Sequence, residues 1–259
     1  MSRLLVSLFM LMLSFISFAE TAEEKGLAIA VESDKRDQGW VDSRVNLEMI
    51  LRNSRGDESR RQMRLKNLEV EGDGDKSLTI FDTPRDIKGT GLLTFSHKVK
   101  ADDQWLNLPA LKRIKRIASK NKSGPFVGSE FAFEDLSSQE VEKYTYKYLR
   151  DEVLDGQDTF VMERYPVDKY SGYTRQTVWI DQLHYRLMKV DYYDRKNALL
   201  KTLLFTGYKQ YLDKYWRAGT MAMFNHQTKK STDLLWNDYE FATGLDDNDF
   251  TRNSLQRAR

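Results

Sequence analysis

The chain reads VNLEMILR over residues 45–52 and NSRG over residues 53–56, and this stretch decides the fold. Apolar residues alternate with polar ones along it, which is the period of a strand with one buried face. The apolar positions are Val45, Leu47, Met49 and Leu51. The NSRG segment is typical of a turn, and residues 63–66 repeat the alternation beyond it. The sequence therefore predicts an antiparallel hairpin here.

The same pattern continues outward along the rest of the chain. The segments GDGD at residues 72–75 and DG at residues 155–156 are typical turn signals. Further strand-like runs lie at residues 78–81, 141–150, 160–162, 174–181, 188–192, 199–208, 216–224 and 231–239. We count about ten or eleven strands, and their close spacing predicts an antiparallel meander in a sandwich or barrel.

Helices are expected at few places. Thr21-Ala22-Glu23-Glu24 is a capping-box pattern, which predicts a helix that ends near Arg36. Residues 114–119 and 134–139 are the other segments with a helical pattern. No repeat of fixed period and no low-complexity linker interrupts the chain, so we expect residues 20–259 to form one domain.

The first residues resemble a secretory signal peptide. Arg3 supplies a positive charge, residues 4–18 are almost wholly apolar, and Ser17-Phe18-Ala19 places small residues at the expected cleavage site. A membrane anchor is the alternative, but an apolar run of this length is short for a bilayer span of about 20 residues. We therefore expect export with cleavage after Ala19 and a soluble mature protein in the periplasm.

Composition excludes several classes of protein. The chain has no cysteine, so it has neither a disulfide nor the lipid-modified cysteine of a lipoprotein. Removal of Arg3 with the signal peptide leaves 40 basic residues against 39 acidic ones. This near-neutral balance argues against a general nucleic-acid binder.

The sequence contains no recognisable catalytic constellation. His97, His184 and His226 lie far apart in the sequence, and no cysteine accompanies them, so no metal site is expected. Glu130, Glu134 and Asp135 lie close together, and we interpret them as a surface turn rather than as an acid–base pair. We expect no enzyme activity and no cofactor.

The most unusual segment begins at Trp105. Six basic residues occur within residues 112–122 and no acidic residue is present there. Lys112, Arg113, Lys115 and Arg116 are candidates for contact with anionic lipid headgroups or with an acidic partner. The alternative is a solvated basic edge that prevents aggregation between strands.

This segment also carries a family resemblance. Residues 105–117 (WLNLPALKRIKRI) and 126–135 (FVGSEFAFED) resemble the outer-membrane lipoprotein-sorting protein family of the LolA/LolB-like superfamily. Weaker matches are GY at residues 172–173, VWID at residues 178–181, YYD at residues 192–194 and LKT at residues 200–202. The resemblance spans nearly all of the expected mature chain.

The resemblance implies a curved antiparallel sheet that forms an unclosed half-barrel, with a few helices covering its concave face. It also implies an apolar cavity for acyl chains of lipoproteins or lipids, and the alternating strands suggest its walls. The candidate cavity residues are Leu47, Met49, Leu51, Met63, Leu65, Phe160, Met162, Val178, Ile180 and Val190. The N-terminal helix, with Leu27, Ile29 and Val31, or the loop at residues 124–128 is expected to cover the cavity.

Two functions therefore remain open. The first is a periplasmic carrier of acyl chains toward the outer membrane. The second, which the resemblance also implies, is a non-carrying accessory subunit of an inner-membrane exporter of the RND type. Periodicity alone favours a filled core over a cavity, because alternating apolar residues occur in both.

Overall fold

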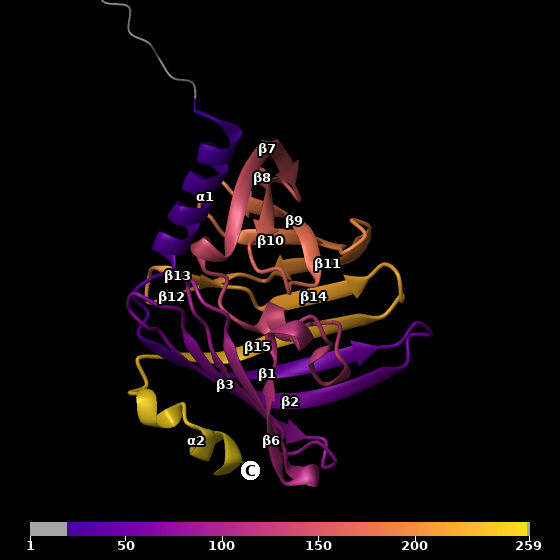
Figure 1. Ribbon diagram of the computed structural model, residues 1–259. Coiled ribbons are helices and arrows are strands. Elements are labelled where there is room, and N and C mark those ends of the chain that lie inside the picture. Colours follow the sequence, from indigo (N-terminus) through magenta and orange to yellow (C-terminus); the bar gives the residue numbers. More distant parts are fainter. Residues whose placement is uncertain (1–19, 258–259) are drawn as a thin grey trace, which may run out of the picture.

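The computed structural model describes residues 20–257 (Figure 1). Its helices and strands follow one another along the chain as α1 (Ala22–Arg36), β1 (Asp42–Arg52), β2 (Glu58–Leu68), β3 (Lys76–Thr83), β4 (Gly91–Phe95), β5 (Asp103–Leu108), β6 (Arg113–Ile117), β7 (Tyr144–Leu154), β8 (Gln157–Pro166), β9 (Tyr173–Asp181), β10 (Leu187–Asp194), β11 (Leu199–Thr206), β12 (Lys209–Tyr211), β13 (Tyr215–Arg217), β14 (Thr220–Asn225), β15 (Ser231–Phe241) and α2 (Arg252–Arg257). Short 3₁₀ turns are η1 (Pro109–Leu111), η2 (Ser119–Asn121), η3 (Phe126–Gly128), η4 (Phe133–Leu136), η5 (Val141–Lys143) and η6 (Asp247–Asp249).

One large antiparallel sheet dominates the described residues. Its thirteen strands lie in the order β6-β5-β4-β3-β2-β1-β15-β14-β11-β10-β9-β8-β7, and β12 and β13 form a separate hairpin. The pairing of β1 with β15 joins the two halves of the chain at the centre of the sheet. The first and last strands of this order do not pair with each other, so the predicted unclosed antiparallel sheet is confirmed. The sheet has more strands than the ten or eleven expected, because short strands such as β4 and β6 show too little alternation to be recognised.

The two edge strands of the sheet, β7 and β6, differ in what lies beside them. Helix α1 packs on β7, and a Cβ atom on Gly26 would lie 2.8 Å from the backbone nitrogen of Tyr148. This close approach requires glycine in the helix. Among the described strands, β6 hydrogen-bonds to β5 alone, and it exposes a run of basic side chains, a common protection of an edge strand.

The predicted N-terminal helix is confirmed, and its cap is the expected one. The Thr21 side chain accepts from the Glu24 backbone nitrogen, and the Glu24 carboxylate accepts from the Thr21 backbone nitrogen. The helical expectation for residues 114–119 is wrong, because residues 113–117 form β6, where pairing with β5 overrides local preference. Of residues 134–139, only the short turn η4 is helical.

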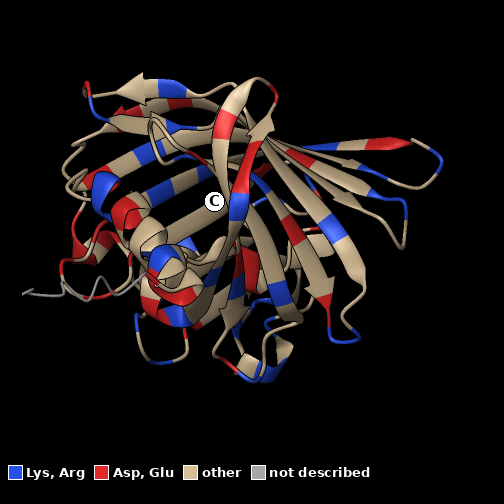
Figure 2. Ribbon diagram, turned by 90° about the horizontal axis from the view of Figure 1, so that it is seen from above, with Lys and Arg blue, Asp and Glu red and all other residues tan. Residues whose placement is uncertain are grey.

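Apolar side chains cover both faces of the sheet. The larger core lies on the inner face and includes Leu47, Met49, Phe81 and Val178. A smaller core on the outer face contains Leu78, Ile80 and Leu93, over which α2 places Leu255. Seen from above, the strands bend around the interior, and charged residues of both signs are interspersed along them (Figure 2).

The expected signal peptide, residues 1–19, lies outside the described residues. Among the residues described, no helix has both the length and the apolar character needed to cross a membrane.

Candidate functional site

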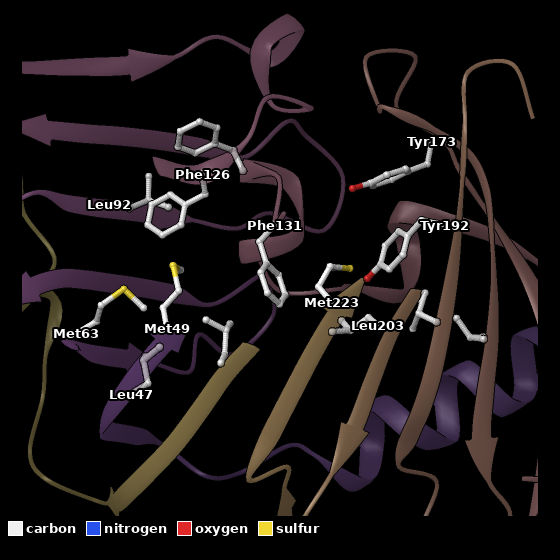
Figure 3. Close-up of a cluster of buried hydrophobic side chains, with 14 of the residues drawn as sticks. Leu47, Met49, Met63, Leu92, Phe126, Phe131, Tyr173, Tyr192, Leu203 and Met223 are labelled. Atoms are coloured by element: carbon white, nitrogen blue, oxygen red, sulfur yellow. The ribbon is translucent and has the colours of Figure 1, made fainter. Parts of the chain in front are cut away.

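A segment from the middle of the chain fills part of the inner face. We call Phe126–Ser138 the plug; it contains η3 and η4 and comes from the loop between β6 and β7. Its Phe126 and Phe131 are each 1% exposed. Figure 3 shows Phe126 beside Leu92 and Phe131 between Met49 and Met223. The Phe126 ring also contacts Phe81, with centroids 5.6 Å apart. The loop at residues 124–128 was one of the two segments expected to cover the cavity, and its Phe126 lies in the core.

The plug is a small hairpin with a strained tip. The Phe126 backbone nitrogen donates to the Phe131 carbonyl at 2.7 Å, and Pro125 bridges Ala132. Val127 has a φ of 47°, a left-handed conformation that is costly for a β-branched residue. The Arg61 guanidinium donates to the Val127 carbonyl at 2.6 Å, which helps to hold this tip.

Buried polar contacts fasten the base of the plug to the sheet. The Lys201 ammonium on β11 lies 2.6 Å from the Asp135 carboxylate, and both side chains are only 4% exposed. Lys201 also donates to the Glu130 carbonyl at 2.9 Å, and the Tyr173 hydroxyl donates to Asp135 at 2.9 Å. Each polar group thereby has a partner, which a buried charge requires.

The interpretation of Glu130, Glu134 and Asp135 as a surface turn is therefore wrong. The Glu130 carboxylate accepts from the Asn225 amide at 2.6 Å. The Glu134 carboxylate accepts from the Gly172 backbone nitrogen at 2.8 Å and from the Ser171 hydroxyl at 2.8 Å. Burial, and next to it the Asp135 charge, raises the pKa of Glu134. All three carboxylates hold the plug, and the tertiary structure brings in partners that lie 37 to 95 residues away in sequence.

Beside the plug lies a pocket of about 740 Å³. Strands β1, β2, β3, β14 and β15 contribute to its floor, and the plug forms one wall. The opposite wall comes from the end of α1, the β9–β10 turn and the β12–β13 hairpin, with Arg36, Tyr185, Tyr208 and Trp216. The Ser33 hydroxyl donates to the Tyr185 carbonyl at 2.8 Å, which ties the end of α1 to this wall. The volume is within the range of about 300–1,000 Å³ that is usual for small-molecule sites.

The floor of the pocket has a polar end and an apolar end. Ser43, Asn67 and Ser77 are direct cross-strand neighbours on β1, β2 and β3, and all three line the pocket. Two residues further along β2, Leu65 pairs with Thr79, and beyond them Met63 pairs with Leu47 and Phe81. Side chains two residues apart on a strand share a face. The registers of β1, β2 and β3 therefore place polar side chains at one end of the pocket floor and apolar side chains at the other.

The polar end also contains a carboxyl group, Asp75. It lines the pocket together with Ser96, Ser137 and Ser138. One of its oxygens accepts from the Val70 backbone nitrogen at 3.2 Å, and no hydrogen bond reaches the other from the described residues. Burial, and after it the charges of Glu140, Glu69 and Asp37, raises the pKa of Asp75 to about 7.

The ten candidate cavity residues fall into two groups. Leu47, Met49, Met63 and Leu65 line the pocket. The other six belong to the inner core or pack against it without lining the pocket, namely Leu51, Phe160, Met162, Val178, Ile180 and Val190. Within α1, the expected cover residue Ile29 is buried, whereas Leu27 and Val31 are 45% and 47% exposed.

Of the four candidate basic residues, Lys112 follows η1 and the other three lie on β6, and none of them lines the pocket. Lys112, Arg113, Lys115 and Arg116 are all exposed. Of the four, only Arg116 forms an ion pair with a described residue, Asp103.

Several pocket residues were not predicted from sequence. Phe205, Met221 and Trp236 line the apolar end, and Tyr208 and Trp216 line the wall near α1. Apolar and polar residues alternate only weakly around these positions, so the sequence does not show which residues face the pocket. The three histidines lie apart: His97 contacts Asp73 at 2.7 Å, His184 packs on Trp216 and His226 contacts Thr202. Within residues 20–257, no group of three metal-ligating side chains is found.

Comparisons with known proteins agree with this architecture. A family model described as an uncharacterized protein matches residues 73–257, and no curated protein matches the chain. A crystal structure of an outer membrane lipoprotein-sorting protein domain from Vibrio parahaemolyticus is 65% identical, covers 91% of this chain and 100% of its own, and has a TM-score of 0.89. A DUF1329 family protein from Desulfovibrio piger is 28% identical over 91% of this chain and 99% of its own, with a TM-score of 0.86.

A more distant structure shares the fold. A LolA superfamily protein from Nitrosomonas europaea is 20% identical, covers 91% of this chain and 100% of its own, and has a TM-score of 0.71.

Proposed function

This chain belongs to the family of outer-membrane lipoprotein-sorting proteins with a LolA-like fold, and we propose that it is a periplasmic carrier of amphiphiles with acyl chains. The observation that carries the proposal is the pocket of about 740 Å³ between the plug and the end of α1, whose floor includes Leu47, Met49, Met63 and Leu65. Residues 1–19 are proposed to direct export, and residues 20–259 to act as one lipid-binding domain.

The pocket chemistry supports binding rather than catalysis. Transfer of an acyl chain from water gains about 0.8 kcal/mol per buried methylene, so a long chain supplies affinity without directed polar chemistry. The methionines Met49, Met63 and Met221 are flexible and polarizable, which suits a wall that accepts chains of different shape. The six candidate residues outside the pocket are proposed to support its walls from the surrounding core.

Uptake of a fluorescent fatty-acid probe tests the carrier proposal. Leu65→Trp adds bulk to the pocket floor, so we expect probe uptake to fall by at least about tenfold while the fold is retained. Leu204→Trp is the matched control, because Leu204 is 42% exposed and does not line the pocket. Unchanged uptake in Leu65→Trp, or no uptake by the original protein, would contradict a carrier that uses this pocket.

A second candidate function is supported by the exposed edge of the sheet. Strand β6 has no partner on its outer side among the described residues, and Lys112, Arg113 and Lys115 carry no ion pair to a described carboxylate. We propose that this basic edge contacts anionic headgroups or an acidic partner, such as a periplasmic face of an RND-type exporter. A protein that docks there without uptake of a lipid probe would be an accessory subunit rather than a carrier.

A further inference from the structure

The apolar end of the pocket closes abruptly along three neighbouring strands. One row of cross-strand neighbours on β1, β15 and β14 lines the pocket, namely Met49, Leu234 and Met221. The next row on the same face lies two residues further along each strand and does not line the pocket; it consists of Leu51, Thr232 and Met223. At about 3.3 Å per residue, the pocket therefore ends within about 7 Å, between one row of side chains and the next.

The Phe131 side chain of the plug stands at this boundary. It lines the pocket, is 1% exposed and lies between Met49, in the last lining row, and Met223, in the row behind it (Figure 3). Beyond Met223 lies the filled core of the second half of the sheet, with Leu203 and Tyr192 (Figure 3). The ring of Phe131 thus separates the pocket from this core.

The backbone beside Phe131 is held in place by hydrogen bonds to three strands. The Glu130 backbone nitrogen donates to the Thr232 hydroxyl on β15 at 3.0 Å. The Glu130 carbonyl accepts from the Lys201 ammonium on β11 at 2.9 Å, and the Glu130 carboxylate accepts from the Asn225 amide on β14 at 2.6 Å. A ligand that pushed Phe131 aside would have to break these part-buried contacts, which is costly. The ring is therefore a fixed wall.

The length of the floor can be compared with that of an acyl chain. From Ser43 at the polar end to Met49 at the apolar end, the floor spans about 20 Å along β1 at about 3.3 Å per residue. An extended chain with C–C bonds of about 1.5 Å advances about 1.3 Å per carbon, so about 16 carbons reach from one end to the other.

We propose that Phe131 determines substrate specificity by setting the longest acyl chain that the pocket accepts, about 16 carbons. The terminal methyl group of such a chain would lie against the ring, over Met49 and Leu234. This inference rests on the proposed carrier function and specifies the substrate class of that pocket.

The test measures displacement of a fluorescent apolar probe by saturated fatty acids of 12, 14, 16 and 18 carbons, each below its aggregation limit. In the original protein, affinity should rise about fourfold for each added carbon up to about 16 and then stop rising. Phe131→Ala joins the space of the ring to the pocket. In that variant the 18-carbon acid should bind at least about tenfold more tightly than the 16-carbon acid, whereas the original protein should bind the two equally.

Phe133→Ala is the matched control. Phe133 belongs to the same plug and is 8% exposed, but it does not line the pocket, so its removal should leave the ratio of the two affinities unchanged. A purely structural role of Phe131 would lower the affinity for every chain length alike, and the ratio would again stay the same.

The outcomes are distinct. An unchanged ratio in Phe131→Ala, or a continued rise beyond 16 carbons in the original protein, would overturn the inference and leave the carrier function intact. If circular dichroism shows that Phe131→Ala does not fold, the milder Phe131→Leu decides, and an unchanged ratio there would overturn the inference as well. Absence of binding of every fatty acid by the original protein would instead refute the carrier function.

Discussion

Removal of the Lys201 ammonium should be among the most damaging single changes in the chain. Lys201→Met keeps most of the side-chain volume but leaves the Asp135 carboxylate, 4% exposed, without its cation. Tyr173 and the Ala132 backbone nitrogen would still donate to Asp135, at 2.9 and 2.7 Å. Loss of one partner of a buried ion pair typically costs about 3–5 kcal/mol, because the remaining charge stays desolvated.

This cost is large relative to the total stability of a domain, which is about 5–15 kcal/mol. For a chain of this size, each kcal/mol lowers Tm by about 2–4 °C, so we expect a decrease of about 6–20 °C. Urea unfolding followed by tryptophan fluorescence measures the change in free energy directly. The plug should also loosen, so the pocket beside it should bind a lipid probe less well.

Two further variants make the reasoning refutable. The double variant Lys201→Met/Asp135→Asn removes both charges and should be less damaging than Lys201→Met alone, because no uncompensated charge remains. Arg55→Met breaks an exposed pair with Asp57, whose side chains are 82% and 66% exposed, and should leave Tm unchanged. A loss below about 1 kcal/mol for Lys201→Met, or a double variant worse than the single one, would show that this pair does not hold the plug.

The remaining predictions concern a carboxyl group, a helix contact and the basic edge. Because burial raises the pKa of Asp75 in the folded protein to about 7, the folded state binds an extra proton above the ordinary pKa of the group, and stability should fall as pH rises from about 4 to 7. Asp75→Asn should lack this decrease, so parallel urea-midpoint curves for the two proteins between pH 4 and 8 would contradict the assignment. Gly26→Ala should lower the thermal midpoint despite the better helix propensity of alanine, because the new Cβ would lie 2.8 to 3.1 Å from the backbone of Tyr148 and Lys147. Leu27→Ala, at a 45% exposed position, is the control. An increased midpoint for Gly26→Ala would refute the close contact. Arg113→Gln/Lys115→Gln should weaken binding to anionic vesicles at low salt by about 1 kcal/mol per charge. The control variant Lys229→Gln/Lys230→Gln, on an exposed turn, should bind the vesicles as the original protein does. An equal effect of both pairs would indicate non-specific attraction.

Much of the fold could be predicted from the sequence, because its determinants are local. The capping box at Thr21 and Glu24 specified the start of α1, and alternation in residues 45–52 specified the inner face of β1. Turn signals after residue 52 and before residue 157 specified the hairpins of β1 with β2 and of β7 with β8. These features depend on neighbours within a few residues, so they can be recognised in an isolated sequence.

The tertiary structure decided what no local pattern contains. The β1–β15 pairing joins residues about 190 positions apart, and only that register places Trp236 beside Leu47 in the lining of the pocket. Asp135 and Glu134 resembled a surface turn because their partners Lys201 and Ser171 lie 66 and 37 residues away. Alternation marked Leu47 and Val178 alike as inward-facing, but whether an inward side chain meets a pocket or a filled core depends on where the plug lies. That position is set by long-range polar contacts and packing, which the sequence encodes only through the complete fold.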